Sequence, residues 1–147
     1  LFLHILEKQT ENPGQPLKPL IKVASGGELS RISLAIQMIA AQRMTLPALI
    51  FDEVDTGIGG GIAEVVGQQL RQLGANRQVL CVTHLPQVAS KAHHHYKVTK
   101  VKTAQQTSTA IEPLNAETRV IEIARMIGGV DLTPATLTLA SEMLTPC

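Results

Sequence analysis

The first regular pattern of apolar and polar positions predicts a helix that begins after Ser25. Apolar residues recur every three or four positions, as they do on one face of a helix, at Leu29, Ile32, Ile36 and Ile39. Ser25 and Glu28 match the S-x-x-E capping box, in which the serine hydroxyl accepts a hydrogen bond from a free N–H group of the first turn. A capped helix start explains this spacing without any ligand.

Two glycines, Gly26 and Gly27, stand in the first turn of that helix. Glycine is unfavourable there unless something must approach the backbone closely. Free N–H groups at a helix N-terminus bind anions, because the helix dipole adds partial positive charge. The glycines therefore favour a phosphate-binding turn at Ser25-Gly26-Gly27-Glu28.

Two continuous apolar runs, at 48–51 and 79–82, are typical of buried strands in a parallel sheet. The segment between them regains a helical period, at Ile62, Val65, Val66, Leu70 and Leu73. This pattern predicts a strand–helix–strand unit in which both strands point the same way.

Acidic residues follow the first strand, and a histidine follows the second. Asp52 and Glu53 come directly after the first run, Asp55 stands two positions further on, and Thr83-His84 ends the second run. Parallel strands end at the same edge of a sheet, where ligands bind, so we expect His84 to share an edge with Asp52 and Glu53. Three carboxylates this close repel one another unless a cation or an activated water separates them. A solvated acidic loop and a structural histidine are the plainer interpretations.

In this order, the motifs resemble the second half of an ABC-type ATPase head. Residues 24–28 resemble the ABC signature, 48–53 resemble Walker B, 55–57 stand where the D-loop belongs, and His84 stands where the switch histidine belongs. Three longer stretches, 23–32, 51–60 and 82–89, resemble in sequence the RecN family, which are bacterial SMC-like proteins of DNA double-strand break repair.

The resemblance implies an α/β fold, with a mostly parallel sheet flanked by helices, as the C-terminal part of a P-loop ABC/SMC-type head. It also implies roles. ATP would be bound from the opposing head by Ser25, Gly26, Gly27 and Glu28. Asp52 would hold Mg²⁺ through water, Glu53 would act as general base, and His84 would contact the γ-phosphate or the attacking water. Asp55 would link the two sites across the dimer.

The chain has no G-x-x-x-x-G-K-[ST] motif, so the phosphate-cradling loop and its lysine must come from elsewhere. It begins at Leu1 and carries no heptad run. We therefore expect 1–147 to be a single domain, the C-terminal lobe of a head that lacks its Walker A lobe and coiled coil and is inactive alone. The resemblance implies three partners: the N-terminal Walker A lobe of the same protein, a second head in an ATP-sandwiched homodimer, and DNA bound by the full-length protein.

The amino-acid composition excludes several classes of protein. Hydrophobic residues make up 44% of the chain and charged residues 17%, which are values of a globular protein rather than a disordered one. No apolar stretch is long enough to span a membrane, and no leader pattern opens the chain. Cys81 and Cys147 show neither metal-ligand nor disulfide spacing, so a reducing cytoplasm fits, with nucleoid association implied by the resemblance. Aromatic residues, at 2%, argue against a base-stacking surface.

Basic residues are unevenly distributed, although the net charge is only +1. No acid occurs from 65 to 111, and Lys97, Lys100 and Lys102 fall in this stretch. They belong either to a solvated face or to a basic rim that faces DNA or a partner head. His93-His94-His95 lies beside them; adjacent residues of a strand point to opposite faces, so we expect no metal there.

The flanking segments are interpreted as scaffold. We expect a strand at 1–6, a turn at 12–14, and a hairpin of 96–102 with 107–114. A helix capped by Asn115 should end at Gly128-Gly129, and a last helix should start at Thr133-Pro134.

Two other classes stay open. Gly57-Ile58-Gly59 follows a strand and opens a helix, as in dinucleotide-binding oxidoreductases, but Ile62 stands where the last glycine of G-x-G-x-x-G belongs. The other class is a non-catalytic dimerisation module that keeps the ATPase shape. The presence of Ser25 and Glu53 favours the ATPase over this module.

Overall fold

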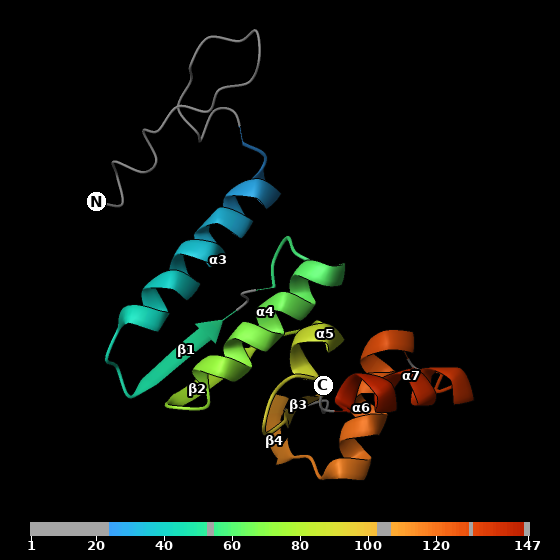
Figure 1. Ribbon diagram of the computed structural model, residues 1–147. Coiled ribbons are helices and arrows are strands. Elements are labelled where there is room, and N and C mark those ends of the chain that lie inside the picture. Colours follow the sequence, from blue (N-terminus) through green and yellow to red (C-terminus); the bar gives the residue numbers. More distant parts are fainter. Residues whose placement is uncertain (1–23, 53–54, 103–106, 130, 146–147) are drawn as a thin grey trace, which may run out of the picture. The chain divides into compact units, whose positions relative to one another are not determined.

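The computed structural model describes residues 24–52, 55–102, 107–129 and 131–145 (Figure 1). These residues divide into two compact units, one of 24–44 with 56–58 and the other of the remaining described residues. The expected strand at 1–6 and turn at 12–14 lie outside the described residues, and the expectation of one domain over 1–147 stays a prediction. Among the described residues, no helix has the length and apolar character to cross a membrane.

The first unit contains helix α3, Gly26–Arg43. Its predicted capping box is confirmed: Ser25 Oγ accepts from the Glu28 N–H at 3.3 Å, and the Glu28 carboxylate accepts from the Ser25 N–H at 2.8 Å. The buried side chains of this helix are Leu34, Met38 and Ala41. Ile39 is exposed, although it belongs to the predicted apolar stripe. Apolar residues stand on several sides of α3, so spacing alone did not identify the buried side.

The second unit contains the strand–helix–strand motif formed by β1 (Ala48–Asp52), α4 (Gly60–Leu73) and β2 (Gln78–Val82). The two strands pair in parallel from Ala48↔Gln78 to Asp52↔Val82, as predicted. The predicted burial of both sheet faces is wrong for one face. Phe51 is only 6% exposed, but Ile50 is 74% exposed, and Leu80 and Val82 beside it are also exposed. Among the described residues β1 and β2 hydrogen-bond only to each other, so this is a small part of a sheet.

Helix α4 packs against the four-residue helix α5, Pro86–Ala89. Its buried residues are Ala63, Val66, Gly67, Leu70 and Leu73. A Cβ at Gly67 would lie 2.9 Å from the Gln87 carbonyl oxygen, so only glycine allows this approach. Ile62 and Val65, which also fit the helical period, are exposed. The close contact with α5, rather than side-chain size, sets the inner face of α4.

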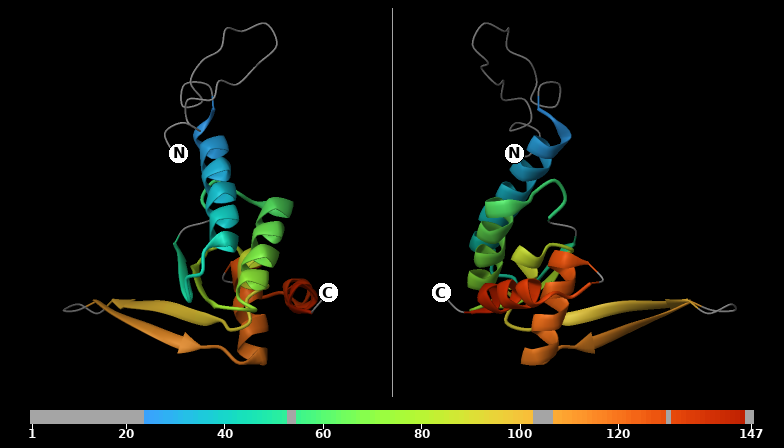
Figure 2. Two further views of the ribbon diagram at one scale, coloured as in Figure 1. Left: turned by 60° about the vertical axis from the view of Figure 1, so that its left-hand side comes forward. Right: turned by 90° about the vertical axis from the view of Figure 1, so that its right-hand side faces the viewer.

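The rest of the second unit is a hairpin followed by two helices. Strands β3 (Tyr96–Lys102) and β4 (Thr107–Pro113) pair antiparallel, as predicted, and extend away from helix α6, Ala116–Gly128 (Figure 2). Helix α6 is capped by Asn115 at its start and is followed by Gly129, whose φ of 80° favours glycine.

Helix α7, Pro134–Leu144, begins at the predicted Thr133 cap and packs against α6. The small core between these helices contains Ile123, Ala124 and Ala140, with Ala89 of α5. Ile123 is completely buried, whereas Ile121, two positions earlier on the same helix, is 48% exposed. The contact between α5 and α6 therefore joins this core to the segment that follows β2.

Candidate functional site

The carboxyl ends of β1 and β2 bring acidic and imidazole side chains to one edge of the sheet. Asp52 pairs in register with Val82, and Thr83-His84 follows directly. The predicted shared edge is thus confirmed for Asp52 and His84. Asp52 is exposed. Glu53 lies outside the described residues, and its role as general base stays a prediction.

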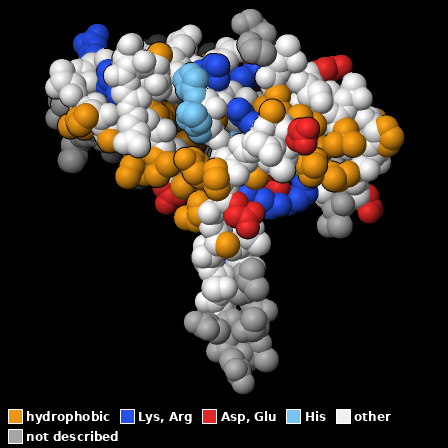
Figure 3. Space-filling view, turned by 90° about the horizontal axis from the view of Figure 1, so that it is seen from below, with side chains coloured by type: hydrophobic (Ala, Val, Ile, Leu, Met, Phe, Trp, Pro, Cys, Tyr) orange, Lys and Arg blue, Asp and Glu red, His pale blue; other side chains and the backbone are white. Residues whose placement is uncertain are grey.

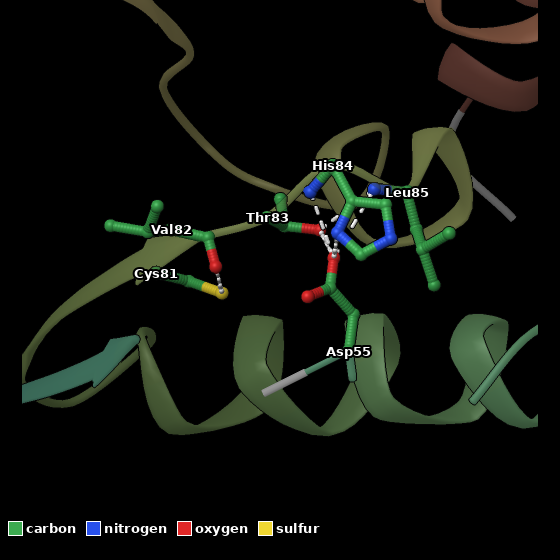
Figure 4. A network of polar contacts seen from close by, with 6 residues as sticks. All are labelled: Asp55, Cys81, Val82, Thr83, His84 and Leu85. Carbon is green, nitrogen blue, oxygen red and sulfur yellow. Dashed lines mark hydrogen bonds and ion pairs between the residues drawn. The ribbon is translucent and has the colours of Figure 1, made fainter. Parts of the chain in front are cut away.

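Asp55 is the centre of a polar network at this edge (Figure 4). The residue is 1% exposed, and its Oδ2 accepts hydrogen bonds from the hydroxyl of Thr83, from the His84 N–H at 2.8 Å and from the Leu85 N–H at 3.2 Å. The same oxygen lies 3.2 Å from His84 Nδ1. Asp55 therefore holds three consecutive residues, 83–85, at the point where β2 leads into α5.

The network keeps Asp55 ionised. Burial of the carboxyl disfavours its charge, but the hydrogen bonds from Thr83 and from the His84 backbone outweigh that cost, and the pKa of Asp55 is lowered. Nearby Cys81 shows the opposite behaviour. Burial, together with the negative charges of Asp55 and Asp52, raises the pKa of its thiol to about 11. Cys81 is therefore a neutral thiol at neutral pH and not a nucleophile.

The segment after His84 is held at its other end by two guanidinium groups. Arg71 of α4 donates from Nη1 to the Lys91 carbonyl at 2.8 Å. Arg119 of α6 donates from Nη2 to the Ser90 carbonyl at 3.0 Å and also to the carbonyls of Ala89 and Ala92. Cations near the last carbonyls of a helix stabilise it, so these arginines fix the end of α5. Sequence reasoning missed both, because 20 and 29 residues separate the partners and neither arginine belongs to a motif.

The first turn of α3 forms a second group of candidate residues, in the first unit. The leading N–H groups of a helix have no partner inside it, and Ser25 satisfies only that of Glu28. A Cβ at Gly26 would meet nothing within 4 Å, so packing within the described residues does not require glycine there. Ser25 also donates its hydroxyl to the Glu28 carboxylate at 2.9 Å. The side chain of Glu28 thus occupies donors that a phosphate would use.

Gly57 lies against this turn within the same unit. Its φ of 78° is a conformation that favours glycine, and a Cβ there would lie 3.5 Å from Gly27 Cα and from Ser30 Cβ. Gly57, the last residue of the predicted D-loop, therefore lies against the signature turn within the first unit. The Asp55 side chain, predicted to act across a dimer, is buried in its own unit against 83–85.

The three predicted DNA-facing lysines do not share one environment. Lys97 Nζ lies 2.9 Å from Oε2 of the buried Glu122, which also binds Arg125. Lys100 is exposed and occupies the alternate face of β3. The side chain of Lys102 lies outside the described residues. On the face in Figure 3, basic side chains lie among histidine and apolar groups rather than in one continuous surface.

The histidines at 93–95 show no metal-binding geometry in the described part of the chain, where no cluster of three or more His, Cys, Asp or Glu residues could hold an ion. Burial, together with the charge of Arg119, lowers the pKa of His95. Burial and the charge of Arg71 likewise lower the pKa of His93.

Solved structures of similar fold are SMC heads. The chain matches the SMC head domain of Thermotoga maritima with 27% identity and a TM-score of 0.51, over 71% of this chain and 38% of that one. It matches the head domain of Pyrococcus yayanosii Smc, solved with a coiled coil and joint, with 19% identity and a TM-score of 0.60, over 80% of this chain and 22% of that one. The α/β fold of an SMC-type head is thus confirmed.

Curated relatives are more similar in sequence. Proteins named DNA repair protein RecN from Vibrio cholerae and Xylella fastidiosa are 58% and 56% identical over 133 residues, which is 90% of this chain and 24% of theirs. The protein of that name from Bacillus subtilis is 46% identical over 133 residues. No protein-family model matches the chain. The chain spans about a quarter of the length of these relatives, and it belongs to the RecN family.

Proposed function

We propose that this chain supplies the signature, Walker B and switch-histidine parts of an ATP-hydrolysing head that serves DNA double-strand break repair and recombination. The observation that carries this proposal is the parallel register of β1 and β2, which brings Asp52 to the same sheet edge as His84. The names of the relatives support the repair role. In that role the protein works in the cytoplasm, at the nucleoid.

Asp52 fits a magnesium ligand. Its carboxylate is exposed at the carboxyl end of a parallel strand, where α/β proteins bind ligands. Mg²⁺ usually takes one or two carboxylates, water and substrate phosphates, so one exposed carboxylate suits it better than a closed cage. When bound, the ion neutralises charge on the phosphate oxygens. Asp52 then orients the ion's water shell at the strand end.

Glu53 and His84 act on the attacking water and the γ-phosphate. Glu53 follows Asp52 directly and takes the proton of the attacking water as general base. His84 has 72% of its side chain exposed, so its ring can reach a phosphate placed at the sheet edge. Phosphoryl transfer depends mainly on positioning and charge stabilisation, which matches this set of fixed polar groups.

The signature turn binds the γ-phosphate of ATP held by a second head. The N–H groups of Gly26 and Gly27 provide donors at the positive end of α3. Ser25 donates its hydroxyl after it turns from the Glu28 carboxylate, which accepts that hydrogen bond in this structure. The open space at Gly26 allows a ligand to reach the backbone.

The head is completed by an N-terminal Walker A lobe of the same protein. The exposed apolar face of the sheet, with Ile50, Leu80 and Val82, is the kind of surface that another lobe covers. Two completed heads then form a homodimer with ATP between them. Lys100, exposed on the hairpin, is the best placed of the three lysines to meet DNA.

The experiment is ATP hydrolysis by this chain alone and after mixing with the Walker A-bearing part of the protein. We expect no turnover alone and turnover on mixing. Glu53→Gln should then trap the ATP-bound dimer and abolish turnover, whereas Glu142→Gln, the same change at an exposed carboxylate of α7, should leave it unchanged. No turnover after mixing, with both parts folded and associated, would indicate a non-catalytic dimerisation module.

A further inference from the structure

The Asp55 network has a chemical consequence for His84. A carboxylate whose pKa is lowered has no proton to give, so the nitrogen that contacts it must be the donor. His84 Nδ1 lies 3.2 Å from Asp55 Oδ2, and this contact with a carboxylate favours the proton on Nδ1. The other ring nitrogen, Nε2, is left without a proton in the neutral ring and presents a lone pair.

The backbone of His84 is fixed by the same oxygen. Asp55 Oδ2 accepts from the His84 N–H at 2.8 Å and from the Leu85 N–H at 3.2 Å. Leu85 is the N-cap residue of α5, and its own N–H donates to both Asp55 Oδ2 and the Thr83 hydroxyl, so the two side chains fix the backbone where α5 begins. One carboxylate oxygen thus sets the position of the main chain and one nitrogen of the ring, while most of the ring faces solvent.

We propose that Asp55 is a positioning residue for His84, which fixes the Nδ1–H tautomer and presents Nε2 to the reacting phosphate or its attacking water. This inference rests on the proposed function for the role of His84, but the tautomer itself does not. In the neutral ring, Nε2 accepts a hydrogen bond from the attacking water. In the protonated ring, Nε2–H donates to a phosphate oxygen. In both states Asp55 keeps the same nitrogen turned inward.

The tautomer is measured directly by nitrogen-15 NMR of the histidine rings in this chain at a pH where the rings are neutral, with His84→Gln assigning its signals among the five histidines. We expect a protonated Nδ1 and a bare Nε2. Asp55→Asn should shift His84 towards a mixture of tautomers. The matched control is Glu122→Gln, which alters another buried carboxylate that contacts Lys97 and Arg125 instead, and it should leave His84 unchanged. A bare Nδ1 in the unsubstituted chain would overturn the proposal, even if Asp55→Asn fails to fold.

A kinetic cycle tests the positioning role in the mixed, ATP-hydrolysing protein. Asp55→Asn should lower turnover roughly tenfold or more, as loss of a residue that orients a functional histidine does. In a His84→Ala background the same change should cost nothing further, because Asp55 acts through that ring. An equal loss in both backgrounds would overturn the positioning role. Normal turnover in His84→Ala would instead refute the proposed function of His84, while the spectra would still decide whether Asp55 fixes the ring.

Discussion

The two candidate turns of this chain satisfy their polar groups in opposite ways. At the strand edge, Asp55 is buried, and its hydrogen-bond partners at 83–85 belong to the same unit. At the start of α3, the Ser25 hydroxyl accepts from the N–H of Glu28, and the N–H groups of Gly26 and Gly27 have no partner within the helix. The first arrangement shapes a functional residue from inside the fold. The second leaves backbone N–H donors available to a ligand that is not part of this fold.

The largest expected difference between the two turns is in stability. Asp55→Ala removes a buried acceptor from several donors and should lower the free energy of unfolding by about 3 kcal/mol. Asp52→Ala, which changes an exposed carboxylate three positions earlier, should stay within about 0.5 kcal/mol. Urea unfolding of both variants measures the difference. Equal losses would show that the Asp55 network is not a source of stability.

The glycines sharpen the same comparison. Gly67→Ala places a Cβ 2.9 Å from the Gln87 carbonyl oxygen and should destabilise the chain by about 2 kcal/mol through overpacking. Thermal unfolding would reveal this loss, and Gly61→Ala on the open first turn of α4 is the control. A neutral Gly67→Ala would mean that α4 and α5 can separate at little cost.

Stability at low pH should depend more on the buried carboxylate of Asp55 than on the exposed carboxylate of Glu28. The folded pKa of Asp55 is lowered below its ordinary value of 3.8, so its contribution is present above that pH and is lost as the pH falls through the folded pKa. Hydrogen bonds from Ser25 also lower the pKa of Glu28, but that side chain is fully exposed and its contribution is smaller. We therefore measure the free energy of unfolding between pH 5 and pH 2. Its fall with decreasing pH should be reduced more by Asp55→Asn than by Glu28→Gln. The reverse order would contradict the burial argument.

Gly26→Ala gives the smallest change in stability and the opposite sign. Nothing crowds a Cβ there, and alanine is the better helix former, so the chain should gain about 0.5 kcal/mol. In the mixed protein the same variant should lose ATP turnover, because the methyl group covers the N–H groups of the turn. A gain in stability with unchanged turnover would remove the signature turn from the site.

The local elements could be predicted because each has a local cause. The caps at Ser25, Asn115 and Thr133 and the apolar runs of β1 and β2 fixed where helices and strands lie. The buried sides could not be chosen from periodicity alone. Ile121 and Ile123 are equally apolar, but only Ile123 packs against α7 and α5.

Of the candidate site, only the residues at the ends of the two parallel strands could be predicted from the sequence. Register places Asp52 beside Val82, as the parallel pattern requires. The contact of Asp55 with His84 joins residues 29 apart, and it depends on a turn whose path no short motif determines. Alternation on β3 could have separated Lys97 from Lys100, because residues of a strand point to opposite faces. The sequence interpretation had grouped them by charge alone.

The reactivity of Cys81 can report whether β2 is in place. Its thiol lies partly buried in β2 and has a pKa of about 11, so it reacts slowly with alkylating reagents while the strand is in place. In a Cys147→Ser background, its labelling rate would follow the transient opening of β2. If labelling becomes slower after the Walker A-bearing part is added, that part stabilises β2. The measurement needs neither nucleotide nor turnover.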